Sequence, residues 1–189
     1  MKKIAIFASG NGSNAERLVE YFQGSTDVNI SLILTNNAKA GVLERAKNLG
    51  VESVIFNRQE FGENAKVDLL LQANKIDFII LAGFLWLIPN FMINNFPDKI
   101  VNIHPALLPK YGGKGMYGMN VHNTVINAGE KQSGISIHYV NSKYDEGQII
   151  FQATVEIEEN ETAETLAAKI HDLEYKHFPQ IIEETLLSI

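Results

Sequence analysis

The chain has 189 residues, of which 46% are hydrophobic and 20% are charged, proportions typical of one globular domain. Its net charge of −6 argues against a nucleic-acid partner, because such proteins present a basic surface. It contains no cysteine, which excludes disulfides and thiolate chemistry. No stretch approaches the length of a membrane span, and the first apolar run is too short for a signal peptide. We therefore predict a cytoplasmic protein whose single domain covers residues 1–189.

Predicted strands and helices alternate in the first half of the chain. Apolar runs predict strands at 2–8, 29–34, 51–56, 77–82 and 99–103. Helical spacing predicts helices at 15–22, 43–49 and 64–75, the second ending at Gly50, and a short helix or turn up to Asn95. Because the strands are continuously apolar, we predict a Rossmann-like α/β fold, in which helices cover both faces of a mostly parallel sheet. This first half extends over residues 1–103.

The second half, residues 104–189, has a different pattern. A segment rich in glycine and proline, 105–119, precedes a predicted helix at 120–127. The runs 133–140 and 148–157 predict an antiparallel strand pair, the first with Ile135, Ile137 and Tyr139 on one face. A helical tail follows at 162–187, and we expect Pro179 to interrupt it.

The run Gly10-Asn11-Gly12-Ser13-Asn14-Ala15 follows a strand and opens a helix. Backbone amides at such a turn bind phosphate, whereas the structural alternative is an ordinary turn capped by Ser13 or Asn14. The run also fits the loose dinucleotide pattern G-x-G-x-x-A. The second strand, however, ends in Thr35-Asn36-Asn37 without the acid that would hold a ribose. A single phosphate is therefore the better ligand.

Asn102 and His104 lie two residues apart in a predicted strand, so their side chains project to the same side. Pro105 keeps His104 extended and ends the strand. If the strand is parallel, this is its carboxyl end, where open α/β sheets place ligands. An amide beside an imidazole suits the stabilisation of an oxyanion; the alternative is a capped strand end with a hydrogen-bonded histidine.

Asp145 lies in the acidic turn between the last two predicted strands. It is either part of a plain hairpin loop or a carboxylate that sets the charge of a histidine and handles a proton through water. His122 and His138 lie in apolar surroundings and are interpreted as structural. No group of residues has the spacing of a zinc site.

Taken together, these segments resemble the phosphoribosylglycinamide formyltransferases, a family of folate-dependent enzymes of purine synthesis. The resemblance covers nearly the whole chain, and its most specific stretch is Asn102-Ile103-His104-Pro105-Ala106-Leu107-Leu108-Pro109-Lys110-Tyr111. Ser9-Gly10-Asn11-Gly12-Ser13-Asn14, Leu81-Ala82-Gly83-Phe84 and Asp145-Glu146-Gly147 match in the same order.

The resemblance implies a role for each group of residues. Asn102, His104 and Asp145 would form the catalytic trio, and Gly12, Ser13 and Asn14 would hold the substrate phosphate. Glu174 and the neighbouring His171 would lie near the glycinamide substrate. The folate pocket would be lined by Leu85, Trp86, Leu87 and Ile88, with Asn141, Ser142, Lys143, Tyr144 and Asp145 closing over the pterin. Asn102 would also contact folate. Family members often have an arginine where Trp86 stands, and an arginine near Asn64 where this chain has only Lys66.

The implied reaction moves a formyl group from 10-formyltetrahydrofolate to the amine of glycinamide ribonucleotide, with no metal. Protonated His104 and the Asn102 amide would stabilise the oxyanion, and Asp145 would favour the charged histidine. The expected partners are these small molecules, and neither nucleic acid nor a membrane is expected to bind. The chain is expected to be a monomer or a homodimer. Formyltetrahydrofolate hydrolase and methionyl-tRNA formyltransferase, each expected to need a further domain, are the related alternatives. A nucleotide-binding module without a reaction is the non-catalytic one.

The segment Tyr111–Gly118 is longer than its counterpart in the family and contains Gly112, Gly113, Gly115 and Gly118. Glycine makes a backbone easy to deform and costly to order. We expect this loop to act as a lid over the predicted catalytic strand; the alternative is a passive connection.

Overall fold

The computed structural model describes residues 1–188 and divides into two compact units, Met1–Val101 and Asn102–Ile189. In the described residues the strands form a mixed sheet in the order β3-β2-β1-β4-β5-β6-β7. The predicted class, a mostly parallel α/β sheet with an antiparallel addition near the C-terminus, is confirmed.

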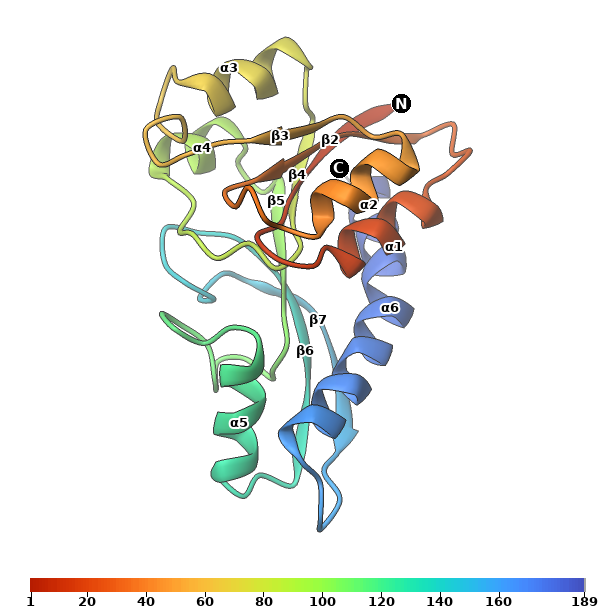
Figure 1. Cartoon of the computed structure of the whole chain (residues 1–189), viewed down its shortest axis with the longest axis vertical. Helices are drawn as coiled ribbons and strands as arrows, with labels where there is room; N and C mark the ends of the chain where they lie inside the picture. The colour runs from red at the N-terminus through yellow and green to blue at the C-terminus, as the bar shows by residue number, and fades with distance from the viewer. Residues whose placement is uncertain (189) are drawn as a thin grey trace. The chain divides into compact units, whose positions relative to one another are not determined.

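The first unit alternates strands and helices as predicted. Its elements are β1 (Lys2–Phe7), α1 (Ser13–Tyr21), β2 (Val28–Thr35), α2 (Val42–Leu49), β3 (Ser53–Ile55), α3 (Lys66–Ala73), β4 (Phe78–Leu81) and α4 (Asn90–Asn95). The strands β3, β2, β1 and β4 are parallel neighbours, and Gly50 ends α2 as expected. Every residue of β4 is buried, so its continuous apolar run reflects burial on both faces. Figure 1 shows α1 and α2 side by side.

Strand β5 (Ile100–His104) carries two predicted site residues. It ends at His104, directly before Pro105, as the restriction that proline places on the preceding residue led us to expect.

The second unit contains α5 (Met119–Asn127), β6 (Gln132–Tyr139), β7 (Ile149–Glu156) and α6 (Ala163–Leu187). The antiparallel pairing of β6 with β7 is confirmed, with Ile135 opposite Ala153. Residues 133–138 of β6 are all buried, so its two faces do not differ as the alternation suggested. Helix α6 runs alongside both strands (Figure 1), which supplies part of this burial.

Pro179 does not interrupt the tail helix, and this expectation was wrong. Helix α6 is assigned continuously over 25 residues with Pro179 inside it. Phe178, Pro179 and Ile182 are all buried, and the stabilisation from burying such apolar groups offsets the hydrogen bond that a proline cannot donate.

Candidate active site

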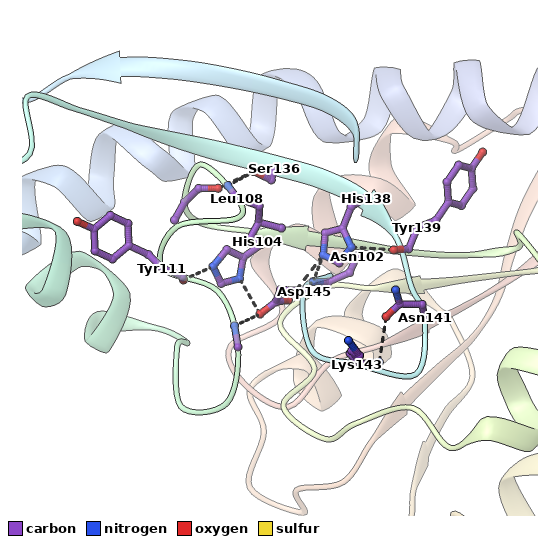
Figure 2. A network of polar contacts seen from close by, with 12 residues as sticks. Asn102, His104, Leu108, Tyr111, Ser136, His138, Tyr139, Asn141, Lys143 and Asp145 are labelled. Atoms are coloured by element: carbon purple, nitrogen blue, oxygen red, sulfur yellow. Dashed lines mark hydrogen bonds and ion pairs between the residues drawn. The ribbon is translucent and has the colours of Figure 1, made fainter. Parts of the chain in front are cut away.

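The second unit brings three of the predicted residues into contact. Asp145 lies in the connection between β6 and β7, with 13% of its side chain exposed. One carboxylate oxygen lies 3.6 Å from His104 Nδ1, and the other lies 3.4 Å from Asn102 Nδ2. Figure 2 shows the Asp145 carboxylate facing both side chains. Asn102 and His104 project to the same side of β5, as their spacing predicted.

His138, interpreted from sequence as structural, belongs to the same cluster. Its Nδ1 lies 2.8 Å from Tyr139 O and its Nε2 lies 3.0 Å from Asn102 Nδ2. A carbonyl can only accept, so Nδ1–H donates to Tyr139 O, which assigns the tautomer and leaves Nε2 to accept from Asn102. Asn102 therefore directs one amide hydrogen at His138 and the other at Asp145 (Figure 2).

His104 is buried, with 4% of its side chain exposed. Its Nε2 lies 2.7 Å from Tyr111 O, so both ring nitrogens face oxygen acceptors. Burial lowers the pKa of His104 below its usual value, although the Asp145 carboxylate and the Tyr111 carbonyl raise it. The Asp145 carboxylate thus favours the charged ring, as expected, but desolvation outweighs both favourable contacts, so His104 is neutral at neutral pH in the ligand-free chain.

Burial acts in the opposite direction on Asp145, because it raises the pKa of a carboxyl group. Three contacts together outweigh burial: His138, whose Nε2 lies 3.6 Å from Asp145 Oδ1, the charge that His104 carries at acidic pH, and the Gly113 N–H. The pKa of Asp145 therefore lies below its usual value. Asp145 is thus a carboxylate at neutral pH that faces a neutral imidazole.

The glycine-rich segment after β5 reaches this cluster. Gly113 N–H donates to Asp145 Oδ2 at 2.9 Å, and Tyr111 contributes the carbonyl that faces His104. A side chain at Gly112 would place its Cβ 2.6 Å from Leu108 Cδ2 and 3.1 Å from Asp145 Cβ, so glycine lets the backbone lie beside both side chains without displacing them.

Alternate residues of β6 hold the end of β5 and the turn after it. Ser136 Oγ accepts from Leu108 N–H at 2.9 Å and donates to Ala106 O at 2.7 Å. His138, two residues on and therefore on the same face, contacts Asn102 as described. The sequence offered one signal for His138: it lies two residues after Ser136 in a predicted strand, so both side chains lie on one face of that strand.

A second polar pair lies on α6. Glu174 is buried and accepts a hydrogen bond from His171 at 2.8 Å, which raises the pKa of His171 above its usual value. His122 on α5 is also buried, and burial lowers its pKa.

In the first unit, Gly12 is the N-cap of α1, has a φ of 79°, and no side chain caps the helix. The reading of this turn as one capped by Ser13 or Asn14 was therefore wrong. Gly12 is buried, and Ser13 and Asn14 are half-buried in the first turn of α1.

The predicted folate-binding segments have mixed surroundings. Leu85 and Leu87 are exposed, whereas Ile88 is buried. Trp86 belongs to an aromatic cluster with Phe56, Phe61 and Phe84. The Arg58 guanidinium lies 4.4 Å from the centre of the Trp86 ring, a cation–π contact at the edge of this cluster.

Asn141 and Lys143 are in the connection between β6 and β7, together with Ser142, Tyr144 and Asp145. Asn141 Oδ1 accepts from Lys143 N–H at 2.9 Å (Figure 2), and Lys143 pairs with Glu146. Of these five residues, Asp145 contacts Asn102 and His104 of the cluster.

Within residues 1–188 no group of three or more histidine, aspartate or glutamate side chains is arranged so that it could hold a metal ion. In the same residues, no helix combines the length and the apolar composition that crossing a membrane requires.

The family model of formyl transferases matches residues 2–182. A phosphoribosylglycinamide formyltransferase of Bacillus subtilis is 36% identical over 98% of this chain and 95% of that protein. The chloroplastic enzyme of the same name from Arabidopsis thaliana is 38% identical over 96% of this chain, which spans 64% of the plant protein's length. The crystal structure of phosphoribosylglycinamide formyltransferase from Anaplasma phagocytophilum superposes with a TM-score of 0.88 at 32% identity, covering 99% of this chain and 88% of that one.

Proposed function

The chain belongs to the formyl transferase family, and we propose that it transfers a formyl group from 10-formyltetrahydrofolate to the amine of glycinamide ribonucleotide in purine biosynthesis. The names of its relatives support this reaction. The observation that carries the proposal is the contact of both Asn102 and His104 with the Asp145 carboxylate. A binding module without a reaction would have no need for these three side chains to meet.

In the proposed step, the substrate amine attacks the formyl carbon and the formyl oxygen becomes an oxyanion. The new C–N bond forms, the bond from carbon to N10 of the folate breaks, the amine loses a proton and N10 gains one. Burial keeps His104 neutral at the start. When the ring takes up a proton, Nε2–H faces Tyr111 O and Nδ1–H faces the Asp145 carboxylate. The positive charge of the ring then stabilises the oxyanion.

Asp145 and Asn102 complete the proposed chemistry. Asp145 stabilises the imidazolium as it forms and relays protons through water. Asn102 offers an amide donor to the oxyanion, and its 3.4 Å contact with Asp145 is the longer of its two hydrogen bonds. That contact is therefore the one that yields to substrate.

The binding roles rest on the family resemblance and on local structure. Gly12, Ser13 and Asn14 bind the phosphate through backbone amides at the start of α1, where the absence of a side-chain cap supports a ligand. Glu174 and His171 bind the glycinamide side. The residues that bind folate are Leu85, Trp86, Leu87, Ile88, Asn102, Asn141, Ser142, Lys143, Tyr144 and Asp145.

We also propose that the chain acts in the cytoplasm on small molecules, as a monomer or homodimer and without metal or nucleic acid. The acidic net charge of −6 supports the absence of nucleic acid. The chloroplastic location is part of the plant relative's name. Fractionation and light scattering measure location and oligomeric state directly.

Replacing His104 by alanine tests the catalytic role. We expect kcat for formyl transfer to glycinamide ribonucleotide to fall by roughly 10²- to 10³-fold, as when one oxyanion stabiliser is removed, with an unchanged circular dichroism spectrum. His177→Ala, a histidine of α6 outside the cluster, is the matched control. Near-normal turnover of His104→Ala would show that His104 only ends a strand. Transfer to methionyl-tRNA or to water in preference to glycinamide ribonucleotide would contradict the proposed substrate.

A further inference from the structure

The glycine-rich loop after β1 is fastened to the start of α2. Successive carbonyl oxygens of the loop accept from the segment 37–45: Ser9 O from Asn37 Nδ2 at 3.2 Å, Gly10 O from Val42 N at 3.2 Å and Asn11 O from Arg45 Nε at 2.9 Å. The carbonyls of this loop, which would repel an anion, are thus occupied by donors from one neighbouring segment.

Gly12 packs against the same segment. A Cβ added at Gly12 would lie 2.4 Å from Val42 Cγ2, and its φ of 79° is unfavourable for other residues. The turn that opens α1 therefore depends on the position of the first residue of α2.

Arg45 joins three groups of this region. Besides Asn11 O, its Nη2 lies 3.2 Å from Asn11 Oδ1, and its Nη1 forms an ion pair with Glu16. One guanidinium thus fixes the main chain and side chain of Asn11 and the first turn of α1, which contains Glu16. A planar guanidinium can satisfy these acceptors together, whereas a lysine ammonium has no such fork.

The ion pair also has an electrostatic consequence. A carboxylate in the first turn stabilises its own helix through the helix dipole. The same charge repels any anion that binds at that helix end. Arg45 offsets the charge of Glu16 where the proposed phosphate site lies.

We propose that Arg45 is a positioning residue that sets the preference for a phosphorylated substrate, acting through Asn11 and Glu16 without touching the phosphate. The inference rests on the proposed function, in which the phosphate binds the amides of Gly12, Ser13 and Asn14. In this proposal, residues in the first turns of α2 hold the loop that forms the phosphate site.

Steady-state kinetics with and without the substrate 5′-phosphate test the inference. For Arg45→Ala we expect KM for glycinamide ribonucleotide to rise about 10-fold, the effect of roughly one charge-assisted hydrogen bond, with kcat changed less than about 2-fold because uniform binding is lost. The dephosphorylated substrate should react equally with both proteins. The control Lys47→Ala removes an exposed cation from the same helix and should change neither constant.

A double-mutant cycle separates charge from geometry. Glu16→Gln removes the carboxylate that Arg45 offsets, so the rise in KM should be smaller in the double variant Arg45→Ala, Glu16→Gln than in Arg45→Ala alone. Arg45→Lys keeps the charge and replaces Arg45→Ala if the alanine variant does not fold. The positioning role would be overturned if KM rose equally for the phosphorylated and the dephosphorylated substrate. It would also be overturned if the only change were a fall in kcat.

Titration with inorganic phosphate, followed by NMR of the Gly12, Ser13 and Asn14 amides, distinguishes this inference from the site on which it rests. We expect the amides of the unaltered chain to shift and those of Arg45→Ala to need about 10-fold more phosphate. Identical titrations would overturn the role of Arg45 and leave the phosphate site intact. Amides of the unaltered chain that do not respond would overturn both, while formyl transfer itself is judged by the His104→Ala assay.

Discussion

At the scale of single residues, the direction of Asn102 depends on His138. The Asn102 amide is held between His138 Nε2 and Asp145, and His138 is in turn oriented by Tyr139 O. His138, which lies on a buried strand, therefore has an indirect role in the site. It orients the Asn102 amide, while His104 and Asp145 handle protons.

His138→Ala should therefore lower kcat by about 10- to 100-fold, because a small misplacement of a catalytic group has effects of this size. KM for glycinamide ribonucleotide should change little, since His138 does not contact substrate in the proposed scheme. His138→Gln retains an oxygen that accepts from Asn102 and should recover part of the activity. A loss of thermal stability with unchanged kcat would identify His138 as a core residue alone.

At the scale of elements, the loop Tyr111–Gly118 is tied to the catalytic cluster. Tyr111 O faces His104 Nε2, and Gly113 N–H donates to Asp145. One of the two oxygen acceptors that face the His104 ring therefore belongs to the loop, so a movement of the loop changes the contacts of His104. The loop is thereby coupled to the state of the site, which favours the lid over a passive connection.

Hydrogen exchange measures this coupling. With glycinamide ribonucleotide and a folate analogue both bound, we expect exchange at residues 111–118 to slow, because a closed lid orders its backbone. The turn at 128–131, between α5 and β6, serves as an internal control and should not change. Equal exchange in residues 111–118 with and without ligands would make the loop a plain connector.

At the scale of the whole molecule, the histidines make stability depend on pH. Burial lowers the pKa of His104, His122 and His177, whereas the hydrogen bond to Glu174 raises that of His171. The pKa of a histidine in an unfolded chain is about 6.5. Below that pH the unfolded chain binds more protons at the first three positions, so stability falls on acidification; His171 acts in the opposite sense, and its side chain is half-exposed and screened.

Tm should therefore fall between pH 7.5 and pH 5.5, by about 2–4 °C for each kcal/mol of stability lost in a chain of this size. Calorimetry at several pH values measures the slope. The double variant His104→Asn, His122→Asn should flatten it, because the two most deeply buried of these rings no longer titrate. A Tm that rises on acidification would mean that His171 dominates.

The sequence by itself determined the elements and the residues of the catalytic motif. Apolar runs, glycine stops and Pro105 are local signals, so β1, β4, β5 and the β6–β7 pair lie close to where they were predicted. The spacing of Asn102 and His104 was enough to place them on one side of a strand, because strand periodicity follows from neighbours in the chain. Their grouping with Asp145 was implied by the family resemblance, since the sequence alone also allowed Asp145 to belong to a plain hairpin loop.

Only the tertiary structure decided the charge of His104, the place of His138 and the continuity of α6 through Pro179. Each depends on segments far apart in the sequence: desolvation at His104, the approach of β6 to Asn102, and the burial of Phe178 and Ile182 around a residue that cannot donate a hydrogen bond. Burial and close approach arise from packing, and packing energies exceed the local preferences from which a sequence is interpreted.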